Sequence, residues 1–246
     1  MDYIKSNINN LTSIWEIVGN TFNTLHKDSS YNYCYVPGSD WPNRVWVAPG
    51  TGAEGQQQAI EAVKRVPLGL TYSHWRGNSE EESLLLKNSG LVIKSEQVGM
   101  SMHLKELLPV AGRLQLIPIR EQAQADIWEA LYPQSFGYKI SAETVLKTAH
   151  LIPYFLIYLN EEPIGTILSI QTGDVIGIHC LGVIPAHRRK GYAEEAMAMA
   201  LNEAIKKGIT WATLQASQLG KGIYSRMGFT DDFMVTNYHL PPREDA

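Results

Sequence analysis

The sequence Arg188-Arg189-Lys190-Gly191-Tyr192-Ala193 joins an apolar run, residues 177–184, to a long helical pattern, residues 193–207. A basic turn that contains glycine and opens a helix directs several backbone N–H groups at one point. The positive end of the helix dipole lies at the same point, so such a turn binds a phosphate or diphosphate without a metal. The turn therefore predicts a phosphorylated cofactor.

The helix that follows the turn has one apolar stripe. Its apolar side chains recur at helical spacing: Ala193, Ala196, Met197, Ala200, Leu201, Ala204 and Ile205. Gly208 ends the pattern directly after Lys206 and Lys207, which face the negative end of the helix dipole. Glu194 and Glu195 in the first turn stabilise the empty helix but oppose a bound anion. Anion binding must therefore depend on the amides and the basic residues.

The order of expected elements predicts the α/β (α+β) class with a mixed, mostly antiparallel sheet flanked by helices. Three strands, residues 154–160, 164–171 and 175–184, follow one another through short turns of the hairpin kind. A crossover helix then leads to a strand at residues 210–216 and a last strand at residues 233–240. A meander that feeds one crossover helix does not give a doubly wound sheet.

The chain is expected to divide in two. Residues 1–110 read as a smaller α/β domain, and residues 113–246 as the domain that binds the cofactor. The first part holds a capping box that begins at Ser79, but it lacks a second basic glycine turn. A degenerate, cofactor-free half of the same fold is therefore one interpretation of it. His74 and His103 are isolated histidines, which are usually packing or surface residues.

Composition argues against several classes of protein. The 246 residues are 44% apolar and 19% charged, which supports a substantial core and not global disorder. The formal net charge of −4 gives no support for binding to nucleic acid or an anionic membrane. Two cysteines make neither a metal cluster nor a disulfide framework. The chain shows neither a signal-peptide pattern nor an apolar run of the roughly 20 residues that span a bilayer, so a cytoplasmic protein is expected.

Residues 182–193 resemble the acetyl-CoA-binding motif of the GCN5-related N-acetyltransferase (GNAT) family. That motif runs Arg/Gln-x-x-Gly-x-Gly/Ala after a strand that ends in valine. The family's second signature resembles residues 214–230, through Leu214-Gln215-Ala216-Ser217, Ile223-Tyr224 and Met227-Gly228-Phe229-Thr230. The match covers residues 113–241 in the expected order. It implies a GNAT-like acyl-CoA N-acyltransferase fold and direct transfer of an acetyl group from acetyl-CoA to an amine.

The resemblance also implies which residues bind acetyl-CoA. The amides of residues 188–193 would hold the diphosphate. The backbone around Leu181 and Val183 would pair with the pantetheine arm as an extra strand does. The expected cofactor-binding residues are Leu181, Gly182, Val183, Arg188, Arg189, Lys190, Gly191, Tyr192, Ala193, Ser217 and Tyr224. No metal is expected.

Direct transfer needs a base for the amine, a donor for the oxyanion and an acid for the leaving thiolate. Tyr224 is the expected acid, because the family often carries there the tyrosine that faces the CoA sulfur. Packing beneath a short helix is its alternative role.

His179 is the candidate base, since a histidine of near-neutral pKa suits proton removal from an ammonium. A satisfied core histidine is the alternative. Strict alternation places His179, Leu181 and Val183 on one face of their strand and Cys180 on the other, which disfavours a Cys–His dyad. The backbone N–H near Val183 is the expected oxyanion donor.

The acceptor is expected in a loop after the first helix of the second half, lined by Tyr132, Phe136 and Tyr138. Plain loop packing is the alternative for these aromatic residues. The acceptor would be a small-molecule or peptide amine. A non-catalytic acyl-CoA-binding or sensing protein, and a transferase for a longer acyl group, are the alternative functions. Neither nucleic acid nor a membrane is an expected partner, and a homodimer stays open.

Overall fold

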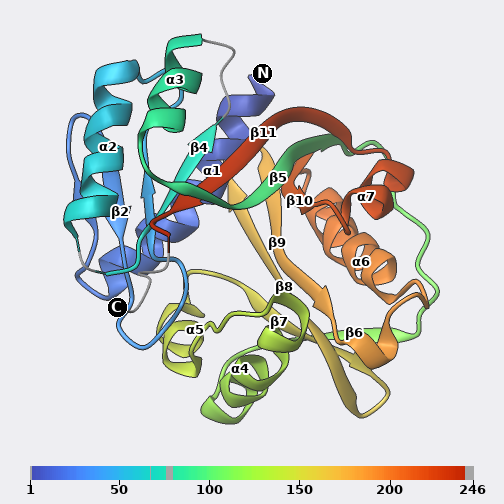
Figure 1. The fold of residues 1–246 in the computed structure, drawn as a ribbon. Coiled ribbons are helices and arrows are strands. Elements are labelled where there is room, and N and C mark those ends of the chain that lie inside the picture. Colours follow the sequence, from blue (N-terminus) through green and yellow to red (C-terminus); the bar gives the residue numbers. More distant parts are fainter. Residues whose placement is uncertain (1, 67, 76–79, 242–246) are drawn as a thin grey trace.

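The computed structural model describes residues 2–66, 68–75 and 80–241. One sheet of eleven strands runs through these residues in the order β1-β2-β3-β4-β11-β5-β10-β9-β8-β7-β6 (Figure 1). Neighbouring strands pair antiparallel, except that β3 and β4, and β9 and β10, are parallel. The predicted fold class, a mixed and mostly antiparallel sheet flanked by helices, is confirmed. The capping box predicted at Ser79 lies outside the described residues.

The bounds of the elements agree closely with the sequence pattern in the second half of the chain. The strands are β1 (His26–Lys27), β2 (Asn32–Cys34), β3 (Arg44–Trp46), β4 (Thr71–Trp75), β5 (Val92–His103), β6 (Leu114–Pro118), β7 (Tyr154–Leu159), β8 (Glu162–Thr172), β9 (Val175–Val183), β10 (Trp211–Ser217) and β11 (Thr230–His239). The helices are α1 (Tyr3–Thr21), α2 (Ala53–Arg65), α3 (Glu80–Asn88), α4 (Gln122–Phe136), α5 (Ala142–Thr148), α6 (Tyr192–Lys206) and α7 (Lys221–Met227), with a 3₁₀ turn at Pro185–His187.

Strands from the two halves of the chain alternate in the middle of the sheet. β5, from the first half, lies between β10 and β11 of the second half. β11 in turn lies between β4 and β5 of the first half. Backbone hydrogen bonds therefore cross the expected boundary at residues 110–113, and both halves build one sheet. Their division into two domains stays a prediction.

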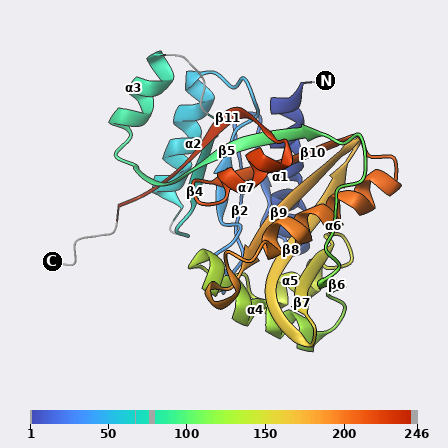
Figure 2. The ribbon, with the colours of Figure 1, turned by 90° about the vertical axis from the view of Figure 1, so that its right-hand side faces the viewer.

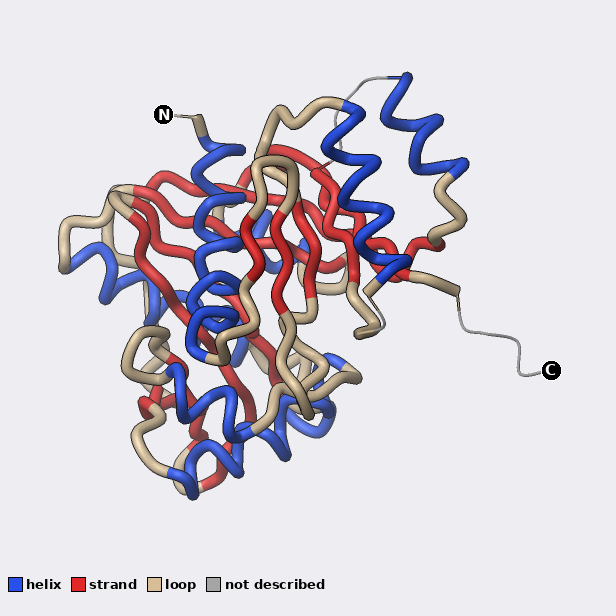
Figure 3. Tube along the Cα trace, turned by 90° about the vertical axis from the view of Figure 1, so that its left-hand side faces the viewer, coloured by secondary structure: helices blue, strands red, loops and turns tan. Residues whose placement is uncertain are grey.

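Helices cover both faces of the sheet. α1, α4 and α5 enclose a core on one face, which includes Trp15, Trp128 and Tyr154. α6 and α7 enclose a second core on the opposite face of β5, β9 and β10. Figure 2 shows α6 and α7 in front of the strands, and Figure 3, from the opposite side, shows α1 lying across them. A third core lies beneath α2 and α3.

Two buried asparagines attach α1 to strands of both halves of the chain. The Asn7 side-chain amide donates to the carbonyls of Met100 (3.0 Å) and Leu214 (3.2 Å). The Asn10 amide donates to the Ile170 carbonyl (3.0 Å) and to the Thr172 hydroxyl (2.9 Å). Since a buried amide without partners is costly, these bonds determine where α1 lies on the sheet. The first helix of the chain thus becomes part of the environment of β9 and β10.

Two expectations from the sequence are wrong in detail. Residues 91–94 and 98–104 predict two strands, whereas β5 is continuous because the polar segment between them pairs with β11. Pro133 predicts a loop, whereas α4 continues through it to Phe136. A capping box at Glu121 begins α4, and Gly137 ends it in a left-handed conformation with φ of 75°. Tyr132 and Phe136 therefore lie on a helix.

Candidate active site

β9 and β10 diverge soon after they begin. Their parallel register joins 211–213 of β10 to 175–177 of β9. Beyond these residues β10 stays with β5 as far as Ser217, and β9 stays with β8 as far as Val183. A gap therefore opens between the carboxyl ends of the two strands. The edge of β9 that faces the gap pairs with no strand of the described chain, so an extended ligand can pair with it.

A β-bulge in β9 decides which side chains face which core. Cys180 has a positive φ of 54°, and the register with β8 shifts between Thr166 and Leu168. The extra residue reverses the alternation that follows it. Cys180 lies in the core beneath α4, on the same face as His179, while Leu181 and Val183 lie in the core beneath α6. The expected placement of these four residues by strict alternation is therefore wrong.

The backbone of Leu181 and Val183 faces the gap. The Ile184 N–H donates to the Ile164 carbonyl of the neighbouring hairpin at 2.9 Å. Because backbone groups alternate in direction along a strand, Gly182 also faces β8, and Leu181 and Val183 face away from it. The Arg188 Nε donates to the Val183 carbonyl at 3.0 Å. Gly182 packs against α4, where an added Cβ would lie 2.6 Å from the Phe136 ring.

The basic turn has the backbone of an anion site. Arg189 and Gly191 adopt positive φ angles of 62° and 79°, which turn neighbouring N–H groups toward one side. α6 begins at Tyr192 with Gly191 as its N-cap, and no side chain caps this end among the described residues. Its first amides are thus available to an anion, together with the positive end of the helix dipole. The turn itself, residues 188–191, is exposed.

Arg113 supports the turn from the start of β6, and sequence reasoning missed it. Its Nε donates to the buried Glu195 carboxylate at 2.8 Å, and its backbone N–H donates to the same group at 2.7 Å. Its Nη1 donates to the Lys190 carbonyl at 3.1 Å, and its guanidinium lies 4.8 Å from the centre of the Tyr192 ring. Glu195 is therefore neutralised by an ion pair and does not oppose an anion as its sequence position suggested.

Tyr224 lies where β10 ends. The ring of Tyr224 and the Ser217 hydroxyl both lie near Gly220, within 3.2 Å and 3.5 Å of the Cβ that a larger residue would add there. Burial raises the pKa of Tyr224 to about 12. Its hydroxyl therefore keeps its proton at neutral pH and can donate it. Tyr224 and Ser217 thus lie near each other at the end of β10, and their role in binding the cofactor stays a prediction.

His179 is a partly buried imidazole that is neutral at neutral pH. Its Nε2 lies 2.9 Å from the Asn10 Oδ1. Because the Asn10 amide nitrogen already donates to two acceptors, its oxygen accepts here, and Nε2 carries the proton. Burial lowers the pKa of His179 to about 4, although a hydrogen bond to Gln215 opposes this shift. The expected near-neutral pKa is thus wrong, and Nδ1 is the nitrogen that can accept a proton.

The three expected acceptor residues lie together against the bulge. The Tyr132 hydroxyl lies 2.6 Å from the Tyr138 hydroxyl, and the Tyr132 and Phe136 rings stack at 4.3 Å. Tyr132 also hydrogen-bonds the Cys180 thiol, whose pKa burial raises to about 12. Burial likewise raises the pKa of Tyr138 to about 12. Cys180 is therefore a neutral thiol, and a thiolate–imidazolium pair with His179 does not form.

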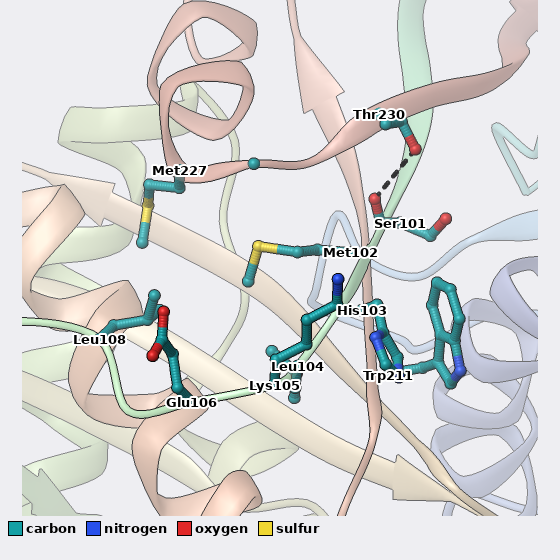
Figure 4. A pocket seen from close by; sticks show the side chains of 11 residues that line it. Ser101, Met102, His103, Leu104, Lys105, Glu106, Leu108, Trp211, Met227 and Thr230 are labelled. Carbon is teal, nitrogen blue, oxygen red and sulfur yellow. Dashed lines mark hydrogen bonds between the residues drawn. The ribbon is translucent and has the colours of Figure 1, made fainter.

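A hollow of about 420 Å³ lies at the other end of β10, away from the gap (Figure 4). Met102, Leu108, Trp211 and Met227 line it together with other residues of 101–106 and with Gly228 and Thr230. Among the described residues, no group of three or more histidine, cysteine, aspartate or glutamate side chains could hold a metal ion. No described helix is long and apolar enough to cross a membrane.

One family model matches part of the second half of the chain. Residues 120–229 match the model of the acetyltransferase (GNAT) family. No curated protein matches the chain.

Solved structures extend the likeness to the first half. A GCN5-related N-acetyltransferase from Kribbella flavida is 16% identical with a TM-score of 0.68, and the match covers 94% of this chain and 95% of that one. One from Sphaerobacter thermophilus is 17% identical with a TM-score of 0.61, and the match covers 99% and 94%. At such identity the likeness concerns the fold. It includes the first 110 residues.

Removal of the Arg113 guanidinium tests its support of the turn. We expect Arg113→Gln to lower the free energy of unfolding by about 2 kcal/mol, below the cost of breaking a fully buried pair because Arg113 is partly exposed. Arg113→Gln combined with Glu195→Gln should recover part of this loss. Urea unfolding measures both, with the exposed Arg120→Gln as the control. Equal stability of Arg113→Gln and the wild type would contradict the role.

Titration of His179 should make the free energy of unfolding depend on pH. Its pKa is about 4 in the folded chain and 6.5 in its unperturbed state. Between these values the unfolded chain binds a proton that the folded chain does not, so stability falls as the pH drops from 6.5 toward 4. We expect His179→Gln to reduce this dependence, and His150→Gln to leave it unchanged. Parallel pH profiles of unfolding for wild type and His179→Gln would refute the assignment.

Proposed function

We propose, from the membership of residues 120–229 in the acetyltransferase (GNAT) family, that this protein moves an acetyl group from acetyl-CoA directly to an amine. The family supports acyl transfer in general, and the choice of acetyl-CoA and of an amine acceptor is our proposal. A cytoplasmic location and a small-molecule or peptide acceptor belong to the same proposal.

One observation carries this function: the uncapped start of α6 lies at the open end of the gap between β9 and β10. The left-handed residues Arg189 and Gly191 direct amides at one point, and no described side chain caps this end of α6. Glu194 lies in the first turn, with Arg226 at 3.9 Å. Glu195 is held by Arg113. A diphosphate at this turn would continue into an arm lying along the edge of β9, which is the shape of coenzyme A.

The chain's residues fit acetyl-CoA as follows. The amides of residues 188–193 would hold the diphosphate, with Lys190 and Arg189 beside it. The backbone groups of Leu181 and Val183 would pair with the pantetheine arm, and Gly182 would let α4 approach. The cofactor supplies the activated acetyl thioester.

Groups near the gap would supply the acid, the oxyanion donor and the base for acetyl transfer. Tyr224 keeps its proton at neutral pH, because burial raises its pKa to about 12, and it would donate that proton to the departing sulfur. The backbone N–H near Val183 would donate to the oxyanion. His179 can accept a proton at Nδ1, but its lowered pKa makes it a weak base. An acceptor that arrives as the neutral amine would need little from His179.

Binding of coenzyme A tests the assigned turn. We expect Gly191→Glu to reduce the affinity for coenzyme A at least about 100-fold, since it adds a negative charge and a strained left-handed residue at the phosphate site. Gly208→Glu is the matched control, because Gly208 has the same φ of 79° at the other end of α6. Calorimetry measures both. Equal affinity in the two variants would refute the site.

Turnover tests the acid. We expect Tyr224→Phe to lower kcat about 100-fold with little change in the affinity for acetyl-CoA, the usual size of one general-acid contribution. Release of free thiol with a panel of amines measures it, and Tyr158→Phe, on the distant β7, is the control. Wild-type turnover in Tyr224→Phe would exclude the role. Binding of acetyl-CoA with no turnover for any amine would favour the non-catalytic alternative.

A further inference from the structure

A line of polar groups, which includes the backbone carbonyl of Gln215, leads from His179 across the sheet to Arg44 of β3. Gln215 hydrogen-bonds His179. The Gln97 amide donates to the Gln215 carbonyl at 3.3 Å, and the Asn237 amide donates to the Gln97 side-chain oxygen at 3.3 Å. The Arg44 Nη1 donates to the Asn237 side-chain oxygen, also at 3.3 Å. These residues come from β9, β10, β5, β11 and β3, so the line joins both halves of the chain.

Arg44 is a partly buried cation without a counter-ion in the described chain. Its Nε is fully buried and has no hydrogen-bond partner there. Burial lowers the pKa of Arg44, and the groups that oppose this shift are Tyr138, Tyr132 and Cys34, none of which is a carboxylate. The charge of Lys94 lies near enough to repel it. A guanidinium taken out of water is costly unless an anion pairs with it.

An acidic side chain near Lys94 has another partner. Asp40 attracts Lys94, but its carboxylate accepts the Lys139 backbone N–H at 2.8 Å. The Arg44 guanidinium instead lies 5.8 Å from the centre of the Trp15 ring. Trp15 packs on Trp46 at 5.3 Å and on Trp75 at 6.2 Å. A cluster of three tryptophan rings thus lies beside the cation but does not neutralise its charge.

The guanidinium also faces the expected acceptor residues. Its charge acts on the Tyr138 hydroxyl, which lies 2.6 Å from the Tyr132 hydroxyl. Tyr132 in turn hydrogen-bonds Cys180 in the bulge of β9. The site therefore has two ends. One end is the bulge with His179, where the amine would meet the thioester, and the other is the unpaired guanidinium.

We propose that Arg44 pairs with a carboxylate of the acceptor, so that the acceptor is a small amine that also carries a carboxylate. This inference rests on the proposed function. The planar guanidinium suits a carboxylate, which can accept two parallel N–H bonds from it. The same charge disfavours polyamines, whose second cation would meet Arg44 and Lys94.

Matched acceptors test the proposal in the wild type. A chain-length series of ω-amino acids is compared with the corresponding ω-amino carboxamides, which keep the amine and lose the charge. We expect kcat/KM to favour the carboxylate by about 30-fold or more at the best chain length, the effect of losing one partner of a buried charge pair. Equal values for acid and amide throughout the series would overturn the proposal.

Variants locate the effect at Arg44. We expect Arg44→Gln to raise KM for the carboxylate by a similar factor, with KM for the carboxamide, KM for acetyl-CoA and kcat unchanged. Arg65→Gln, on α2, is the control and should change none of them. Arg44→Lys keeps the charge and should give an intermediate KM for the carboxylate. If circular dichroism shows Arg44→Gln to be unfolded, the KM of Arg44→Lys is the test of the site. A carboxylate KM unaffected by either change would overturn the proposal.

Failure of the proposed function gives a different result. If coenzyme A binds but no amine is acetylated, acyl transfer is refuted. Calorimetry at saturating coenzyme A then measures whether the same ω-amino acids bind, which tests the carboxylate site at Arg44 independently of turnover. Saturable binding to the wild type that Arg44→Lys weakens supports the site. Binding that is absent, or that is equal for acid and carboxamide, overturns it.

Discussion

The separation of β9 from β10 after a short parallel contact is the constraint on which the proposed site depends. β10 follows β5 on its other edge along its whole length, and β9 follows β8, so neither strand can close the gap. The bulge at Cys180 turns the side chains of Leu181 and Val183 into the core beneath α6. Their backbone groups stay at the open edge. A backbone edge that no described strand covers, with only the Val183 carbonyl bonded to Arg188, thus lies near a helix start that no described side chain caps.

The first half of the chain completes this arrangement. It supplies β5, which holds β10 away from β9, and α1, whose asparagines bind strands of the second half. Asn10 also fixes the tautomer of His179. Solved structures that share the fold also match the chain over nearly its whole length, and not only over residues 120–229. The first half is a structural part of the site.

Charge is distributed unevenly around the gap. Glu195, beside the proposed phosphate site, is neutralised by Arg113, which removes a local opponent of anion binding. Tyr224, Cys180 and His179 are all kept neutral by burial. Arg44 is the exception, a partly buried cation whose Nε has no hydrogen-bond partner in the described chain. A site lined by neutral groups, with cations at two separated places, is suited to an anionic cofactor and an anionic acceptor.

The order of the elements, the basic turn and the two signatures were readable from the sequence, because strand alternation, helical spacing and helix-start chemistry are local properties. The bulge at Cys180 was not readable, because nothing in the sequence distinguishes a strand with an extra residue from a strand that alternates strictly. The faces predicted for Cys180 and for the side chains that follow it in β9 were therefore wrong. The pKa of His179 depended on its burial beneath α1, and the importance of Arg113 depended on its meeting Glu195. The alternation of β5 and β11 with strands of the other half, and the approach of Arg44 to Tyr138, join residues far apart in the chain. Only tertiary packing decides such contacts, because each is selected by the shape and charge of a distant segment.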